Sequence, residues 1–299
     1  MFDTTPSLQC GKYTLNLDAP RIMAIINVTP DSFSDGGHLA SVQQAIDFAL
    51  RAVEQGAHML DVGGESTRPN ARPVSIDEEL SRVIPVIEAL AARVEVPISI
   101  DTSKPQVMRA AVAAGANFIN DVFALRNDGA LDAAAELGVP VCLMHMLGSP
   151  QTMQQDAHYD DVLVQVRQFL TERIFACEMS GIPKKNIVID PGFGFGKQLE
   201  HNLALLANLE YFIQLGVPVL AGVSRKSMIG QITGRALEQR VVGSAAAALI
   251  AAQNGARIIR VHDVAETKDA LAVLSAVQGA ARKDHSIKAK PSIQWPDED

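Results

Sequence analysis

The chain of 299 residues has few cysteines, no surplus of basic residues and no long apolar run. Its three cysteines, Cys10, Cys142 and Cys177, are scattered without the spacing of a metal site, so we interpret them as buried thiols. A formal net charge of -8 argues against a general surface for nucleic acid or anionic membrane. Any anion site must therefore be local.

We expect neither a signal peptide nor a membrane span. Residues 1–20 lack a basic start followed by an apolar stretch. The longest run of small apolar residues, 245–252, is far shorter than the roughly 20 residues that a spanning helix needs. We therefore expect a cytoplasmic enzyme.

The dominant pattern is a unit that recurs along the chain: a short apolar run, a polar residue, then a Gly- or Pro-rich loop. Helix-period segments alternate with these runs, which predicts a parallel sheet with right-handed crossovers. With eight such units, closure into a single (β/α)8 TIM barrel explains the pattern better than an open doubly wound sheet. The first unit also lacks the spaced glycines of a dinucleotide fingerprint. The expected strands are 22–27, 58–62, 97–101, 117–121, 139–145, 187–190, 217–222 and 257–261.

Short segments flank the predicted barrel. Alternating apolar residues at 8–17 predict a β-hairpin that could cap one barrel end, so we divide the chain into a hairpin segment, 1–19, a barrel, 20–281, and a loose tail, 282–299. Long loops follow the first two strands and are candidate lids. Helix caps are expected at Ser41, Ser75 and Ser103.

Polar side chains occupy the carboxyl ends of the predicted strands, where the active site of such a barrel lies. Asp101, Asn120 and Asp190 can bind the edge of a nitrogen-rich heterocycle through paired hydrogen bonds. Each alone could instead cap the following helix, but three in one ring favour a ligand. The other strand ends carry Asn27, Asp61, Met144 with His145, Lys226, and Arg260 with His262.

Cationic groups gather after the last two predicted strands. Lys226, Arg260 and His262, with Ser224, predict an anion site where such barrels often hold a phosphate. Two alternatives remain open. The charges could form a solvated surface group, or Lys226 could form a Schiff base with a carbonyl substrate.

Gly-rich loops complete the predicted pocket. Asp190-Pro-Gly-Phe-Gly-Phe-Gly-Lys197 places a carboxylate before a flat, backbone-lined surface for a planar ligand. Phe33, Phe193 and Phe195 are expected to wall a second ring rather than join the core. Asn27 opens an oxygen-rich loop that suits a weakly held Mg2+, although turn formation alone would explain its composition.

Seven stretches, in this order, resemble those of the dihydropteroate synthase family, pterin-binding barrel enzymes of folate biosynthesis and the targets of sulfonamides. They are Ile26-Asn-Val-Thr-Pro-Asp-Ser-Phe-Ser-Asp-Gly-Gly37, Leu60-Asp-Val-Gly-Gly-Glu-Ser-Thr-Arg-Pro69, Ser99-Ile-Asp-Thr-Ser103, Ile119-Asn-Asp121, residues 190–197, Ser224-Arg-Lys226 and Arg260-Val-His-Asp263. Only the hairpin and the tail lie outside the resemblance.

The resemblance implies a transferase that joins 7,8-dihydropterin-6-ylmethyl diphosphate to 4-aminobenzoate, with Mg2+ as cofactor and a homodimer as assembly. It places Asp101, Asn120, Met144, Asp190 and Lys226 at the pterin, Asn27 at Mg2+ and diphosphate, Arg68, Arg260 and His262 at the anion, and Phe33, Thr67, Pro69, Phe195 and Ser224 around the aminobenzoate. Asp101, Lys226, Arg260 and His262 are expected to be catalytic.

Three other functions remain open at this stage. A pterin-dependent methyltransferase would share the barrel but gives no reason for the anion group or the Asn27 loop. An aldolase-like enzyme would use Lys226, and a non-catalytic carrier would bind pterin without turnover.

Overall fold

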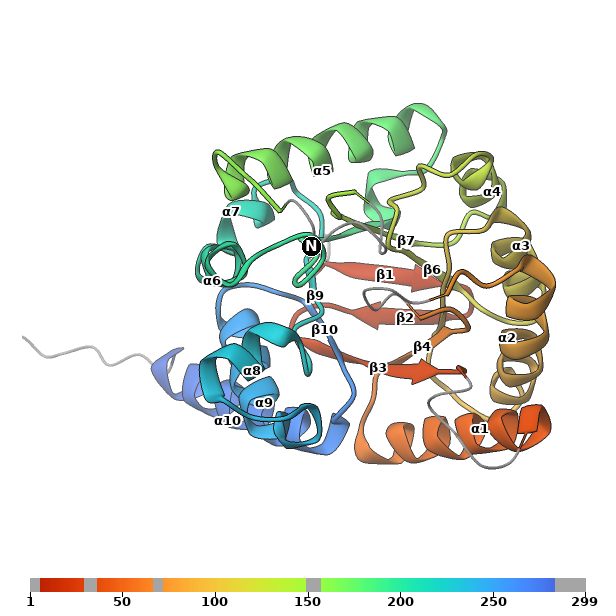
Figure 1. The fold of residues 1–299 in the computed structure, drawn as a ribbon, viewed down its shortest axis with the longest axis horizontal. Helices are drawn as coiled ribbons and strands as arrows, with labels where there is room; N and C mark the ends of the chain where they lie inside the picture. The colour runs from red at the N-terminus through yellow and green to blue at the C-terminus, as the bar shows by residue number, and fades with distance from the viewer. Residues whose placement is uncertain (1–5, 30–36, 67–71, 149–156, 283–299) are drawn as a thin grey trace, which may run out of the picture.

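The computed structural model describes residues 6–29, 37–66, 72–148 and 157–282. Within these ranges, parallel strands form the centre and helices surround them (Figure 1). The barrel strands are β3 (Arg21–Asn27), β4 (Met59–Gly63), β5 (Ile98–Asp101), β6 (Phe118–Asp121), β7 (Val141–Met144), β8 (Ile187–Asp190), β9 (Leu220–Ala221) and β10 (Ile258–Val261).

The helices follow the strands in alternation and leave the strand ends free to form a site. None in the described ranges is long and apolar enough to cross a membrane. They are α1 (Gly37–Gln55), α2 (Ile76–Ala91), α3 (Pro105–Ala113), α4 (Ala130–Leu137), α5 (Val162–Met179), α6 (Leu199–Ala207), α7 (Glu210–Ile213), α8 (Ser227–Thr233), α9 (Val241–Gln253) and α10 (Val264–Arg282), with 3-10 turns at Lys184–Asn186 and Leu237–Gln239.

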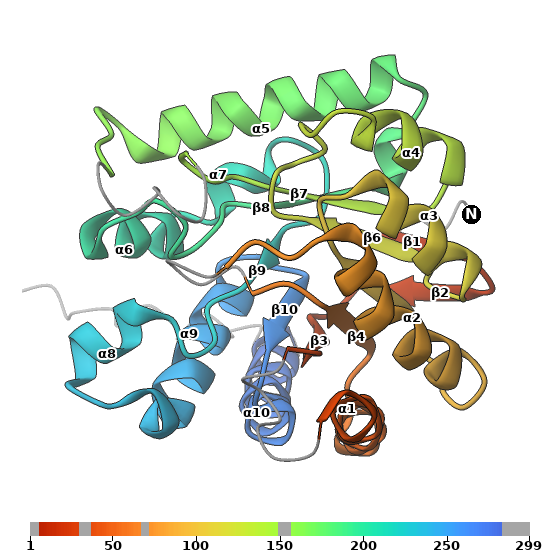
Figure 2. The ribbon, with the colours of Figure 1, turned by 45° about the vertical axis from the view of Figure 1, so that its right-hand side comes forward.

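The sheet closes on itself. Its strand order is β8-β7-β6-β5-β4-β3-β10-β9, and a parallel bridge from Ile189 in β8 to Val219 next to β9 joins the two edges. The first and last barrel helices, α1 and α10, consequently lie side by side (Figure 2). The predicted barrel is confirmed. Its seventh strand is shorter than expected, and Pro218, which lacks an N–H, contributes only its carbonyl, to Ile189.

An antiparallel hairpin, β1 (Ser7–Cys10) and β2 (Tyr13–Asn16), closes the floor of the barrel, as the alternating pattern predicts. Its inward side chains, among them Leu8 and Leu17, pack in one cluster with Met23, Phe118 and Val188 from the strands. All are fully buried. The lower barrel is therefore filled with apolar side chains, and the polar strand ends lie at the opposite, loop-lined mouth.

Of the three predicted N-terminal helix caps, the structure confirms one. Ser75 caps α2, since its Oγ accepts a hydrogen bond from the N–H of Glu78 at 3.2 Å. The Ser41 prediction is wrong because α1 begins one turn earlier, at Gly37. The Ser103 prediction is also wrong because α3 begins at Pro105 and its cap position is Lys104. Proline suits the first position of a helix because it has no N–H that would need a hydrogen-bond acceptor there.

Candidate active site

A bridged pair of carboxylates lies at the centre of the ring of strand ends. Arg260 of β10 donates from Nε to Asp61 Oδ2 and from Nη2 to Asp101 Oδ2, both at 2.6 Å. Asn120 of β6 donates from Nδ2 to the same Asp61 oxygen at 3.0 Å. Arg260 therefore holds β4, β5 and β10 in fixed relation, and it places a guanidinium face at the mouth of the barrel.

Asp61 is a site residue that sequence reasoning left without a role. Its side chain is fully buried, and its Oδ1 has no hydrogen-bond partner among the described residues. A carboxylate within the apolar run of β4 was the available signal. Because a buried charge must be paired, Asp61 fixes the orientation of Arg260 and Asn120 rather than meeting solvent.

The buried charges shift one another's protonation. Burial raises the pKa of Asp101 to about 7, although the neighbouring Arg260 acts in the opposite direction. Burial acts to lower the pKa of Arg260, but the two carboxylates outweigh it and raise that pKa. Arg260 is thus always charged, whereas Asp101 can change its charge near neutral pH.

Asp190 and Lys226 form the opposite side of the mouth. Asp190 Oδ1 accepts the N–H of Gly192 at 2.7 Å, and burial raises the pKa of this carboxyl. Lys226 Nζ lies 4.1 Å from the centre of the Phe195 ring, a distance at which a cation is attracted to the ring face. Burial, together with Arg260, lowers the pKa of Lys226 to about 8.

The first two side chains of the Ser224-Arg-Lys226 turn contact residues that follow β10. Arg225 has a positive φ of 56°, a rare conformation for a residue with a side chain, and its guanidinium makes two hydrogen bonds with the carboxylate of Asp263. Ser224 Oγ lies 3.0 Å from His262 Nδ1. Burial lowers the pKa of His262 to about 3, so this imidazole is neutral at pH 7.

Lys197 holds the Gly-rich loop after β8 against the end of β7, a role that the sequence did not indicate. Its Nζ donates to the carbonyls of Gly192 at 2.9 Å and Phe195 at 3.0 Å, and lies 2.9 Å from His145 Nδ1. A Cβ on Gly192 would lie only 1.9 Å from the His145 carbonyl oxygen. Only glycine therefore allows this packing.

The two loop phenylalanines have different environments. Phe195 joins an apolar cluster with Val122, Met144 and Met146 at the carboxyl ends of the strands. Phe193 is fully buried in the main core between barrel and helices. The prediction that Phe193 faces a ligand is therefore wrong.

The remaining predicted site residues divide into two groups. Asn27 ends β3 at the same mouth and is partly exposed. Phe33, Thr67, Arg68 and Pro69 lie outside the described residues. Between residues 6 and 282, excluding the gaps given above, no group of three or more His, Cys, Asp or Glu residues could hold a metal.

A closed barrel with an acid-amide-acid edge and neighbouring cations at its mouth is typical of an enzyme that binds a flat heterocycle. Comparison with known proteins identifies the family. Residues 23–262 match the family model of the pterin binding enzymes. A dihydropteroate synthase of Escherichia coli is 54% identical over 267 residues, which cover 89% of this chain and 95% of that protein.

Solved structures agree with this assignment. A Xanthomonas albilineans dihydropteroate synthase with 4-aminobenzoic acid is 61% identical, with a TM-score of 0.88, over 92% of this chain and 99% of that one. A dihydropteroate synthase from the same organism in complex with 7,8-dihydropteroate is 58% identical, with a TM-score of 0.84, over 91% and 99% of the two chains. The chain belongs to the pterin-binding enzymes and, within them, to the dihydropteroate synthases, which are transferases of folate biosynthesis.

Proposed function

We propose that the chain joins 7,8-dihydropterin-6-ylmethyl diphosphate to 4-aminobenzoate and releases diphosphate and 7,8-dihydropteroate. The observation that carries this proposal is the Arg260 bridge between Asp61 and Asp101 at the barrel mouth. It places a permanent cation beside a carboxylate that can change its charge. These are the two groups needed to stabilise a leaving anion and a developing flat cation.

The pterin edge would bind across the mouth between β5, β6 and β8. Asp190 uses Oδ1 for the Gly192 N–H, so Oδ2 is the oxygen we assign to the heterocycle. Asn120 is held in place by Asp61, which orients its amide. Met144 and Val122 provide apolar contact with the ring, and they lie in one cluster with Phe195.

The transfer would proceed by departure of diphosphate followed by attack of the amine. The methylene C–O bond breaks, its electron pair leaves with diphosphate, and the amine lone pair then forms the C–N bond. Arg260, together with His262 and Arg68, would bind the leaving anion, and ionised Asp101 would face the pterin cation. Lys226 would hold the pterin from the Phe195 side.

Mg2+ is the cofactor we propose, with Asn27 as its protein ligand. A single amide oxygen at the end of β3 fits an ion that keeps most of its waters and is held chiefly by substrate phosphate. When bound, the ion would neutralise charge on the diphosphate. Arg260 and His262 would orient the same leaving group from β10.

The second substrate would lie against Phe195 and Ser224, together with Phe33, Thr67 and Pro69. The wall formed by Phe195 is apolar and faces the Lys226 side of the pterin pocket, which suits a flat aryl amine. We propose that sulfonamides, which carry a flat aryl amine ring, compete for this position.

Diphosphate release and product formation test the reaction directly. Purified chain is mixed with the pterin diphosphate, with and without 4-aminobenzoate, Mg2+ or a sulfonamide. We expect 7,8-dihydropteroate only when both substrates and Mg2+ are present, with inhibition that excess 4-aminobenzoate relieves. Absence of coupled product under the complete condition would refute the proposed reaction, and tight pterin binding without product would identify a carrier instead.

A homodimer is the assembly we propose, formed through α9 and α10. These helices lie side by side, and each exposes apolar side chains, Val242 and Ile250 on α9 and Val273 and Val277 on α10. Exposed apolar groups on neighbouring helices support an interface between copies. Light scattering should give a dimer for the unmodified chain and a monomer for Val242→Glu with Val273→Glu. Phe175→Glu on α5 is the matched control, and a dimer that survives the α9 and α10 changes rules out this surface.

A further inference from the structure

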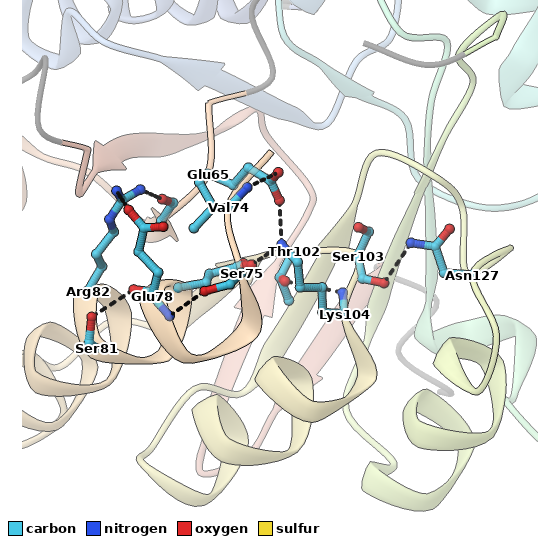
Figure 3. Close-up of polar contacts among 12 residues, drawn as sticks. Glu65, Val74, Ser75, Glu78, Ser81, Arg82, Thr102, Ser103, Lys104 and Asn127 are labelled. Carbon is cyan, nitrogen blue, oxygen red and sulfur yellow. Dashed lines mark hydrogen bonds and ion pairs between the residues drawn. The ribbon is translucent and has the colours of Figure 1, made fainter. Parts of the chain in front are cut away.

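A continuous polar network joins three loops at the barrel mouth, outside the group centred on Arg260 (Figure 3). It connects the β4–α2, β5–α3 and β6–α4 loops. Lys104, in the β5–α3 loop, is its central residue, and the close-up shows it between Glu65 and the start of α2. Asn127 extends the network by donating to the Ser103 carbonyl at 3.1 Å.

Lys104 binds two carboxylates at once. Its Nζ lies 2.5 Å from Glu65 Oε2 and also contacts Glu79 Oε2. Glu79 is fully buried, and its second oxygen has no partner among the described residues. Burial acts to lower the pKa of Lys104, but both glutamates outweigh it and raise that pKa. Lys104 therefore stays charged and is the main compensation for the buried charge of Glu79.

Glu65 links Lys104 to the far end of the β4–α2 loop. Its Oε1 accepts the backbone N–H of Val74 at 3.1 Å, so one side chain joins the start of the loop to its end. Arg82 of α2 donates to the Gly64 carbonyl at 2.7 Å. A Cβ on Gly64 would lie 2.8 Å from Val83 Cγ1, so the loop leaves β4 in close contact with α2.

This group of charges lies next to the catalytic carboxylate but is separately held. A cavity of about 220 Å³ is lined by Glu65, Glu79, Lys104, Asp101 and Phe123, among others. Asp101 and Asn120 are oriented through Arg260 and Asp61, and none of these four residues contacts Lys104 in a hydrogen bond or ion pair within the described part of the chain. The two networks therefore share no hydrogen bond, and the link between them is electrostatic, because the charge of Glu79 contributes to raising the pKa of Asp101.

We propose that Lys104 is a positioning residue for the second substrate. By holding Glu65 and Glu79 together, it fixes both ends of the β4–α2 loop beside Asp101. The inference rests on the proposed function, which assigns Thr67 and Pro69 of this loop to the aminobenzoate. Loss of Lys104 releases Glu65, and with it the loop ends, while the groups assigned to the pterin keep their hydrogen bonds.

The test measures coupling by the full chain with each substrate varied in turn. In Lys104→Met, we expect kcat/KM for 4-aminobenzoate to fall by about tenfold or more, because misplaced binding groups slow capture, while KM for the pterin diphosphate stays within about threefold. Lys104→Arg keeps the charge and should recover most of the loss. Lys12→Met, at an exposed lysine 3.9 Å from Glu95, is the matched control.

A double variant separates positioning from simple neutralisation of Glu79. Lys104→Met with Glu79→Met removes the buried charge along with its partner, so the chain should fold even where the single variant does not. A persistent defect toward 4-aminobenzoate supports the inference. Recovery of the wild-type value overturns it, as does a fully active Lys104→Met. Failure of the proposed function is distinct, since the unmodified chain would then form no product.

Discussion

Arg260→Gln should lower kcat/KM for the pterin diphosphate by about a thousandfold. This is the size of effect expected when one preorganised hydrogen-bond donor is removed from a site that excludes water. The change removes the cation proposed to face the leaving diphosphate. It also leaves Asp61 and Asp101 without the guanidinium that bridges them at 2.6 Å. Steady-state coupling rates and circular dichroism of the same preparation measure the two effects separately.

Two further variants show whether charge or geometry is responsible. Arg260→Lys keeps the cation but cannot donate to two carboxylates from one planar group, so its rate should lie between those of Arg260→Gln and the unmodified chain. Arg257→Gln is the control, because the half-buried Arg257 side chain, among the described residues, donates a hydrogen bond only to the Asp18 carbonyl, at 3.4 Å. A wild-type rate in Arg260→Gln would remove Arg260 from the reaction.

Asp101→Asn should keep most of the pterin affinity and lower kcat by about a hundredfold or more, because an amide retains hydrogen bonding but lacks the charge that stabilises the developing cation. Binding of the pterin diphosphate is measured by calorimetry without 4-aminobenzoate, and kcat by product formation. Equal kcat in the two proteins would show that Asp101 only binds.

The pH profile gives this variant a second readout. Burial raises the pKa of Asp101 to about 7, so the reactive ionised form is lost as pH falls through that value. We expect kcat/KM of the unmodified chain to rise with pH through about 7 and then to fall as Lys226, with a pKa of about 8, loses its proton. In Asp101→Asn only the fall should remain.

Much of this site is predictable because a barrel brings distant strand ends together. Asp101, Asn120 and Asp190 each end an apolar run, and parallel strands in a closed sheet deliver these ends to one rim. The position of Lys226 follows from the same rule. Alternation of strand and helix patterns was enough to predict the closed barrel itself.

Other parts of the site depend on contacts that have no local signal. Arg260 and Asp61 are 199 positions apart, so no sequence window shows that they pair. Lys197 resembles the exposed end of a glycine loop, yet it is buried beneath that loop. Phe193 and Phe195 would share one face in a strand, but the positive φ of Gly194 turns them apart, one into the core and one to the mouth.

The hairpin beneath the barrel also determines which end of the barrel is open to substrates. Leu8, Cys10, Leu15 and Leu17 fill the lower end together with strand side chains, so the described residues leave no passage through the floor of the barrel. We therefore expect both substrates to enter, and both products to leave, at the end of the barrel where the strands carry their polar residues. If the aminobenzoate lies outside the pterin, as in the proposed site, we expect the pterin diphosphate to bind first.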